Sequence, residues 1–316
     1  MFPNDEQENE RLDIHHALID TLLHGRLHIA PISKDPQRVL DLCTGTGIVR
    51  ASTYMSYNQL FAFTNPSSQW AISFGNITPL PPLSNGSGYG LTGLSIKPMN
   101  THQLRERSKP YSTFSVCISI PTPSSISRLH ADSVPPNLKF IVDDVEDEWG
   151  YEGSPFDYIH GRFLIASIRD WPRLIKQAFT PRLTKQTSSC TKPGGWVEFQ
   201  DWDGTIRSDD DTLKGTHLFQ LQETVKEAFI EMGINANPGA ECGSWLKDAG
   251  FINITTQDKH LKTVGAYNLL QHTKGLGGIA NLPLIKKGWQ PEEIEVLLSK
   301  TREDLRNRSI HAYFNL

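Results

Sequence analysis

The chain has 316 residues, of which 38% are hydrophobic and 21% charged, with a net charge of -4. That composition is ordinary for a globular protein with room for one large domain. No apolar run reaches the roughly 18 residues of a membrane span, and the acidic balance disfavours a nucleic-acid-binding surface. The four cysteines form no CxxC pair, so we expect neither a disulfide framework nor a bound metal.

The first 48 residues contain a helix, a strand and a glycine-rich turn. Apolar residues recur at helical spacing over 8–24. Residues 38–42 form a short apolar run that leads directly into Cys43, Gly45 and Gly47. The polar, acidic start does not match a secretion signal, so we expect a cytoplasmic protein, with the nucleus left open.

The character of the chain changes between residues 49 and 132. This stretch is rich in Ser, Pro, Thr, Asn and Gly and shows no sustained helical or strand period. The composition predicts a disordered or intron-derived insertion within a single domain that covers residues 1–316. Only Trp70–Phe74 and Tyr89–Leu94 look more regular.

Strands and helices alternate in the second half of the chain. This alternation predicts an α/β fold with a mainly parallel sheet and helices on both faces. A turn is expected at 193–195. We expect strands at 138–142, 156–159, 196–199 and 251–255, and helices at 170–179, 213–232, 244–249 and 291–305.

The turn after the first strand carries the strongest chemical signal. Asp41 is followed at fixed spacing by Gly45 and Gly47, which let a backbone approach a ligand closely. Open α/β sheets bind ligands at this end of their strands. Arg50 stands where a nicotinamide motif needs its third glycine, and no Gly-Lys-Ser/Thr follows for a phosphate loop. The pattern is similar to the first strand of class I S-adenosylmethionine-dependent methyltransferases, although a turn without any ligand would also explain it.

Taken together, the motifs make the chain resemble the LaeA-like methyltransferases of fungal secondary metabolism. The resemblance covers residues 4–48 and 134–316. It is carried by Asn4–Glu6, Glu10–Asp13, His16, Leu27–Pro31, Val39–Gly47, Val134–Asn137, Asp143, Asp144, Trp149, Phe156–Arg162, Asp170–Pro172, Pro193–Gly195 and His311–Tyr313.

The resemblance implies a class I methyltransferase fold, a Rossmann-like sheet of seven strands, with S-adenosyl-L-methionine as methyl donor. It implies methylation of a small secondary metabolite. The alternatives are a LaeA-like regulator that acts through a velvet-type protein partner, or a catalytically impaired paralogue. His160, at the end of a strand, is the candidate general base, although a histidine that only packs there is an equally simple explanation. The expected cofactor-binding residues are Asp41, Cys43, Gly45, Gly47, Asp143, Asp144 and His16.

Two departures from the family pattern bear on donor binding. Cys43 replaces the first glycine of the turn. The second strand of the family ends in an acid that holds the ribose, but the nearest match here, Gly93–Pro98, contains none. We therefore expect this chain to bind the donor weakly.

Overall fold

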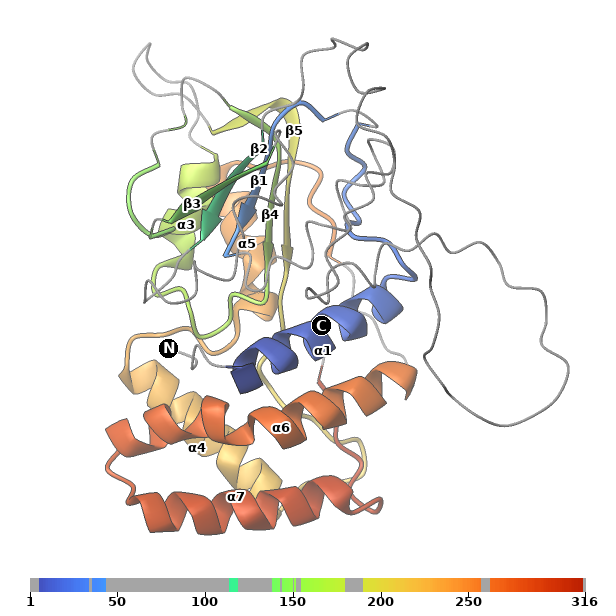
Figure 1. Ribbon diagram of the computed structural model, residues 1–316, viewed down its shortest axis with the longest axis vertical. Coiled ribbons are helices and arrows are strands. Elements are labelled where there is room, and N and C mark those ends of the chain that lie inside the picture. The colour runs from blue at the N-terminus through green and yellow to red at the C-terminus, as the bar shows by residue number, and fades with distance from the viewer. Residues whose placement is uncertain are drawn as a thin grey trace, which may run out of the picture.

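The computed structural model describes residues 6–33, 36–43, 114–118, 138–142, 144–149, 151, 155–179, 190–256 and 262–314. Its centre is a sheet in which all neighbouring strands run parallel, in the order β3-β2-β1-β4-β5 (Figure 1). This is the strand order of a doubly wound α/β fold. The strands are β1 (Val39–Leu42), β2 (Phe114–Ile118), β3 (Leu138–Val142), β4 (Phe156–Arg162) and β5 (Thr191–Gln200).

The strands confirm the expected parallel sheet and correct it in three places. β2 lies inside the stretch 49–132, where we expected no strand, and Gly93–Pro98 lie outside the described residues. β5 begins at Thr191, so the expected turn at 193–195 is an irregular part of a strand whose pairing with β4 shifts register there. Residues 251–256 form no strand. The described residues thus give five strands, and a seven-stranded sheet stays a prediction.

Six helices are described, and local capping explains several of their ends. The Asp170 side chain accepts the Arg173 N–H at the start of α3, and Thr216 accepts the Phe219 N–H at the start of α4. Gly250, with φ +108°, ends α5 in a left-handed conformation. The helices are α1 (Glu6–Leu22), α3 (Trp171–Ala178), α4 (His217–Glu231), α5 (Pro238–Ala249), α6 (Lys262–Lys286) and α7 (Pro291–Arg306).

The helices form two groups around the sheet. α3 and α5 pack together against one face, where Leu40, Ile159 and Trp171 belong to a buried apolar cluster (Figure 1). α4, α6 and α7 pack on one another below the sheet, and α1 lies against α6. The loops that leave β4 and β5 enter the space between the sheet and this second group.

Candidate functional site

The sheet changes the direction of its winding between β1 and β4, the place where doubly wound sheets bind ligands. Three polar residues from neighbouring strands meet there in one row, because Asp41 pairs with His160 and His160 pairs with Glu198 in the strand register. Paired residues point to the same face of a sheet. Parallel strands are normally apolar on both faces, so a buried polar row calls for an explanation.

His160 and Asp41 form a buried pair. Nδ1 of His160 lies 2.7 Å from Oδ1 of Asp41, and the two residues are 4% and 5% exposed. A carboxylate can only accept a hydrogen bond, so Nδ1 carries the proton and a neutral ring has its lone pair on Nε2. That atom is buried, and no group of the described residues hydrogen-bonds it. The ring therefore keeps one nitrogen available for a ligand.

Glu198 is the third member of the row and is held as a carboxylate. It accepts the backbone N–H groups of Ile29 (3.0 Å) and Ala30 (2.9 Å) and the Tyr158 hydroxyl (3.0 Å). Burial would raise its pKa, but the electrostatic interaction with His160 and the hydrogen bonds, with that from Gln200 included, together lower the pKa of Glu198 below its ordinary value. The segment that follows α1 is thus fixed over this face of the sheet.

His16 meets the end of β4 through Arg162. Its Nδ1 lies 3.3 Å from Nη1 of Arg162. The Nε of Arg162 donates to Oε1 of Gln200 (2.7 Å), and its Nη2 donates to the Leu27 carbonyl (3.2 Å). Burial and the charge of Arg162 lower the pKa of His16 to about 4, so the ring is neutral at pH 7 and accepts from the guanidinium. The structure therefore brings His16 to the strand ends, as a partner of Arg162.

The remaining predicted cofactor residues are only partly visible. Cys43 has φ +52°, a left-handed conformation that explains why a glycine is favoured at this position. Asp144 is exposed, and its carboxylate accepts the Glu146 N–H at 2.9 Å. Gly45, Gly47 and Asp143 lie outside the described residues.

Glu198 and the way Arg162 joins three segments were not predicted from the sequence. The one signal in the sequence was that Glu198 is an acid inside the predicted strand Trp196–Phe199. The register between these parallel strands could not be read from the sequence, because Asp41, His160 and Glu198 are far apart along the chain.

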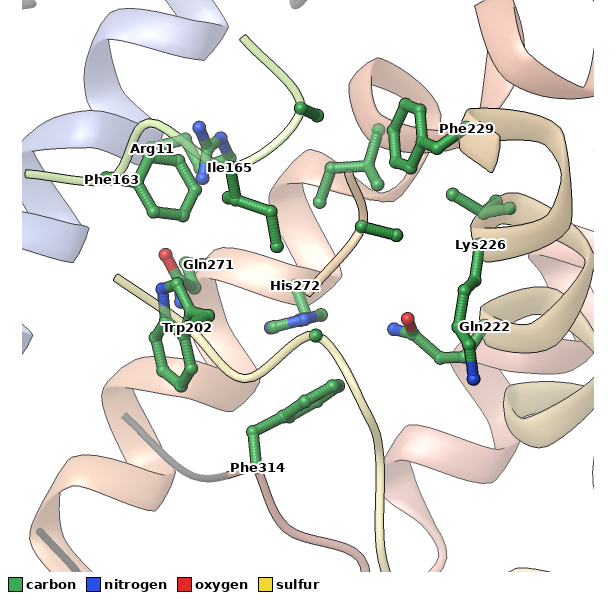
Figure 2. A pocket seen from close by; sticks show the side chains of 15 residues that line it. Arg11, Phe163, Ile165, Trp202, Gln222, Lys226, Phe229, Gln271, His272 and Phe314 are labelled. Atoms are coloured by element: carbon green, nitrogen blue, oxygen red, sulfur yellow. The ribbon is translucent and has the colours of Figure 1, made fainter. Parts of the chain in front are cut away.

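A cavity of about 100 Å³ lies beyond the ends of β4 and β5, between α1, α4 and α6 (Figure 2). Phe163 and Trp202 line it from the loops that follow the two strands. Asp201 joins these loops, because its carboxylate accepts the N–H groups of Leu164 (2.7 Å) and Trp202 (2.9 Å). Burial raises the pKa of Asp201 to about 7 despite these hydrogen bonds.

Two further properties of the described residues bear on function, metal binding and membrane insertion. The described residues contain no cluster of His, Cys, Asp and Glu that could hold a metal ion. None of the helices within those ranges combines the length and the apolar character needed to cross a membrane.

Residues 14–257 match a family described as a methyltransferase domain. The chain is 28% identical to methyltransferase pytC of Aspergillus terreus, over 99% of this chain and 80% of that protein. It is 26% identical to the secondary metabolism regulator LAE1 of Cochliobolus heterostrophus, over 100% and 87% of the two chains.

Among solved structures, the chain is similar to phosphoethanolamine N-methyltransferase 2 of Haemonchus contortus, a complex with S-adenosylhomocysteine. The TM-score is 0.45 and the identity 14%, over 99% of this chain and 52% of the other. This chain thus spans about half the length of that enzyme.

Proposed function

The chain belongs to the methyltransferase domain family, and from that membership we propose that it methylates a hydroxyl or amine of a small secondary metabolite, with His160 as general base. S-adenosylmethionine is the methyl donor and supplies an already activated methyl group on a cationic sulfur. The activity is inferred from relatives such as pytC, which carry methyltransferase names, and the place in secondary metabolism from LAE1, which is named a regulator of it. The observation that carries the role of His160 is its pair with Asp41 at the point where the sheet reverses its winding.

The residues present fit such a donor. The polar row contains two carboxylates, Asp41 and Glu198, and their negative charge favours a nearby cation. The left-handed backbone at Cys43 turns the chain sharply where β1 ends. We propose that Gly45 and Gly47 then let the backbone lie against the donor, that Asp143 or Asp144 meets its adenine, and that His16 helps to close the site.

His160 would take the proton that the acceptor loses. Nε2 of His160 has no hydrogen-bond partner among the described residues. Asp41 binds the Nδ1–H group and so fixes the ring with Nε2 available to the acceptor. A proton that moves to Nε2 gives an imidazolium, which the Asp41 carboxylate stabilises directly. General base catalysis of this kind contributes about 10²–10⁴ to a rate. Positioning of donor and acceptor supplies the remainder.

The test compares the wild type with His160→Asn, whose side-chain amide takes the place of Nδ1 and can still donate to Asp41. Labelled S-adenosylmethionine and a small-molecule extract of the organism that carries the gene are supplied, and labelled products and S-adenosylhomocysteine are measured. We expect turnover by the variant to fall by about 10²–10⁴, while calorimetry shows donor binding unchanged within a few-fold. Full turnover by the variant would exclude His160 as the base, and a wild type that neither binds nor consumes the donor would refute the proposed function.

A second candidate function is regulation through a velvet-type partner, and the similarity to relatives named as secondary metabolism regulators, such as LAE1, supports the regulatory role. Copurification with a velvet-type protein, without turnover of the donor on any small molecule, would favour it over the metabolite enzyme.

A further inference from the structure

We propose that the cavity between α1, α4 and α6 binds the methyl acceptor and selects a single, uncharged aromatic ring that carries an O–H or N–H group. This inference rests on the proposed function, because it assigns the acceptor of the same site. The cavity lies beyond the strand ends that carry His160 and Glu198, since Phe163 directly follows β4 and Trp202 comes two residues after β5.

Aromatic side chains form much of the cavity wall. Trp202 and Phe314 meet edge to face at 6.1 Å, and Phe314 stacks on His272 at 5.4 Å with an angle of 17° between the rings (Figure 2). Phe163 and Phe229 complete the aromatic lining. Rings that already meet one another edge to face or offset offer the same contacts to a further flat ring. A volume of about 100 Å³ restricts the buried part of a ligand to one ring, because an engineered cavity of roughly 150 Å³ holds benzene.

Gln271 supplies the polar selectivity. It lines the cavity and is 3% exposed, and its Nε2 donates to Oδ1 of Asn268 at 2.7 Å. This bond fixes the orientation of the amide, and Oε1 is left without a hydrogen-bond partner within the described part of the chain. A buried acceptor without a donor is unfavourable, and a ligand O–H or N–H would satisfy it. A ring without such a group would leave the oxygen unpaired, which is the basis of strong discrimination between analogues.

The charges on the wall exclude a cationic ligand. The two charged side chains that line the cavity, Arg11 and Lys226, are both positive, and no acid occurs among the described lining residues. Glu8 holds Arg11 through two short hydrogen bonds of 2.6 and 2.7 Å. Burial lowers the pKa of His272, so this ring is neutral at pH 7. An ammonium ligand would therefore enter a buried space without a counter-ion.

The experiment is a ligand-observed NMR titration of the full chain without the methyl donor. The probes are phenol, anisole and protonated benzylamine, which share one ring but differ in donor group and charge. We expect phenol to bind roughly tenfold more tightly than anisole, as one buried hydrogen bond would give, and benzylamine to bind most weakly. Gln271→Met should bring the affinities for phenol and anisole together.

Gln220→Met is the matched control, because Gln220 lies on α4 but is exposed and lies outside the cavity. It should keep the phenol preference. An unchanged preference in Gln271→Met, or benzylamine binding as tightly as phenol, would overturn the proposal. If Gln271→Met does not fold by circular dichroism, Phe314→Ala replaces it, and unchanged phenol affinity in that variant would overturn the proposal as well. Binding of S-adenosylmethionine is measured separately in each protein, so a failure of the proposed function is distinguished from a failure of this inference.

Discussion

The two faces of the central sheet use neighbouring residues of the same strands for different purposes. Leu40, Ile159 and Phe199 face α3 and α5 within an apolar cluster. Asp41 and His160, the next residues along β1 and β4, belong to the polar row on the other face. The alternation of side chains along a strand thus separates the residues that stabilise the sheet from those that can do chemistry.

Two buried acids show how strongly the environment differs. Glu198 lies in the polar row, where His160 and several donors outweigh burial and lower its pKa. Asp201 interacts electrostatically with Cys242, a member of the apolar cluster. Burial raises the pKa of Asp201 to about 7. The comparison implies that changes on the apolar face act on stability alone, whereas changes in the row act on stability to a smaller extent and also on protons and a bound ligand.

Ile159→Ala should give the largest loss of stability. Ile159 is fully buried at the centre of the sheet, and deletion of a buried aliphatic side chain costs about 2–5 kcal/mol in the free energy of unfolding. Urea denaturation measures the loss. Ile252→Ala is the control, because Ile252 is 81% exposed and should change stability by less than about 0.5 kcal/mol. Donor binding below the unfolding transition should be unchanged; a parallel loss of binding would contradict the division between the faces.

Asp201 should make the protein less stable as the pH rises. Its pKa is about 7 in the folded state and 3.8 ordinarily, so the folded state retains a proton that the unfolded chain has lost. Stability should therefore fall between about pH 4 and pH 7, with a slope of up to roughly 1.4 kcal/mol per pH unit. Denaturation at several pH values should show this slope in the wild type and not in Asp201→Asn. Equal slopes in both proteins would exclude Asp201 as its source.

Glu198→Gln should have a smaller effect and the opposite pH dependence. The lowered pKa means that the charged form contributes stability above the ordinary value of 4.5, and that this contribution is lost as the pH falls toward the folded pKa. Replacing a charged acceptor by a neutral one should cost about 1 kcal/mol at pH 7. Thermal denaturation at pH 7 and near pH 3 should show the difference from the wild type shrinking in acid. A difference that grows in acid would contradict the role of the charge.

Trp171→Phe should change stability least. Trp171 stacks on Trp245 at 5.8 Å, and its Nε1 is buried without a partner among the described residues. Phenylalanine removes that unpaired N–H but also some packing, so we expect a net change within about 1 kcal/mol.

Trp202→Phe is the matched comparison on the other side, because the Trp202 indole donates to Nε2 of His15 at 2.9 Å. This variant should lose more stability than Trp171→Phe. A smaller loss in Trp202→Phe would show that the hydrogen bond from Trp202 to His15 does not contribute to stability.

Much of the sheet could be predicted from short apolar runs, because buried strands concentrate them. β1, β3 and β4 lie where the sequence placed them. β2 was missed because its five residues lie in a polar, proline-rich stretch and gain their order from pairing with β1 and β3. The strand expected at 251–255 was wrong: Ile252 and Ile254 alternate with polar residues, but both are exposed, and no strand of the described residues pairs with them.

Helix α6 and the pairing within the site depend on tertiary contacts. α6 contains Gly265, Gly275 and Pro283, residue types with a low propensity for the interior of a helix. Packing against α1 overrides propensity, and at Gly275 a Cβ atom would collide with the Arg11 side chain. His160 was identified from its place at a strand end, but its partner Asp41 depends on the register between strands far apart in sequence.

The position of β1 in the middle of the sheet has a consequence for synthesis of the chain. Leu42 ends β1, and more than a hundred residues follow before β4 begins at Phe156. A ribosome that adds about 5–20 residues per second needs on the order of ten seconds for that interval. During this time one edge of β1 has no strand to pair with, and contacts between such distant segments form slowly. The nascent chain therefore presents an apolar strand to chaperones, or to other nascent chains, before the polar row can assemble.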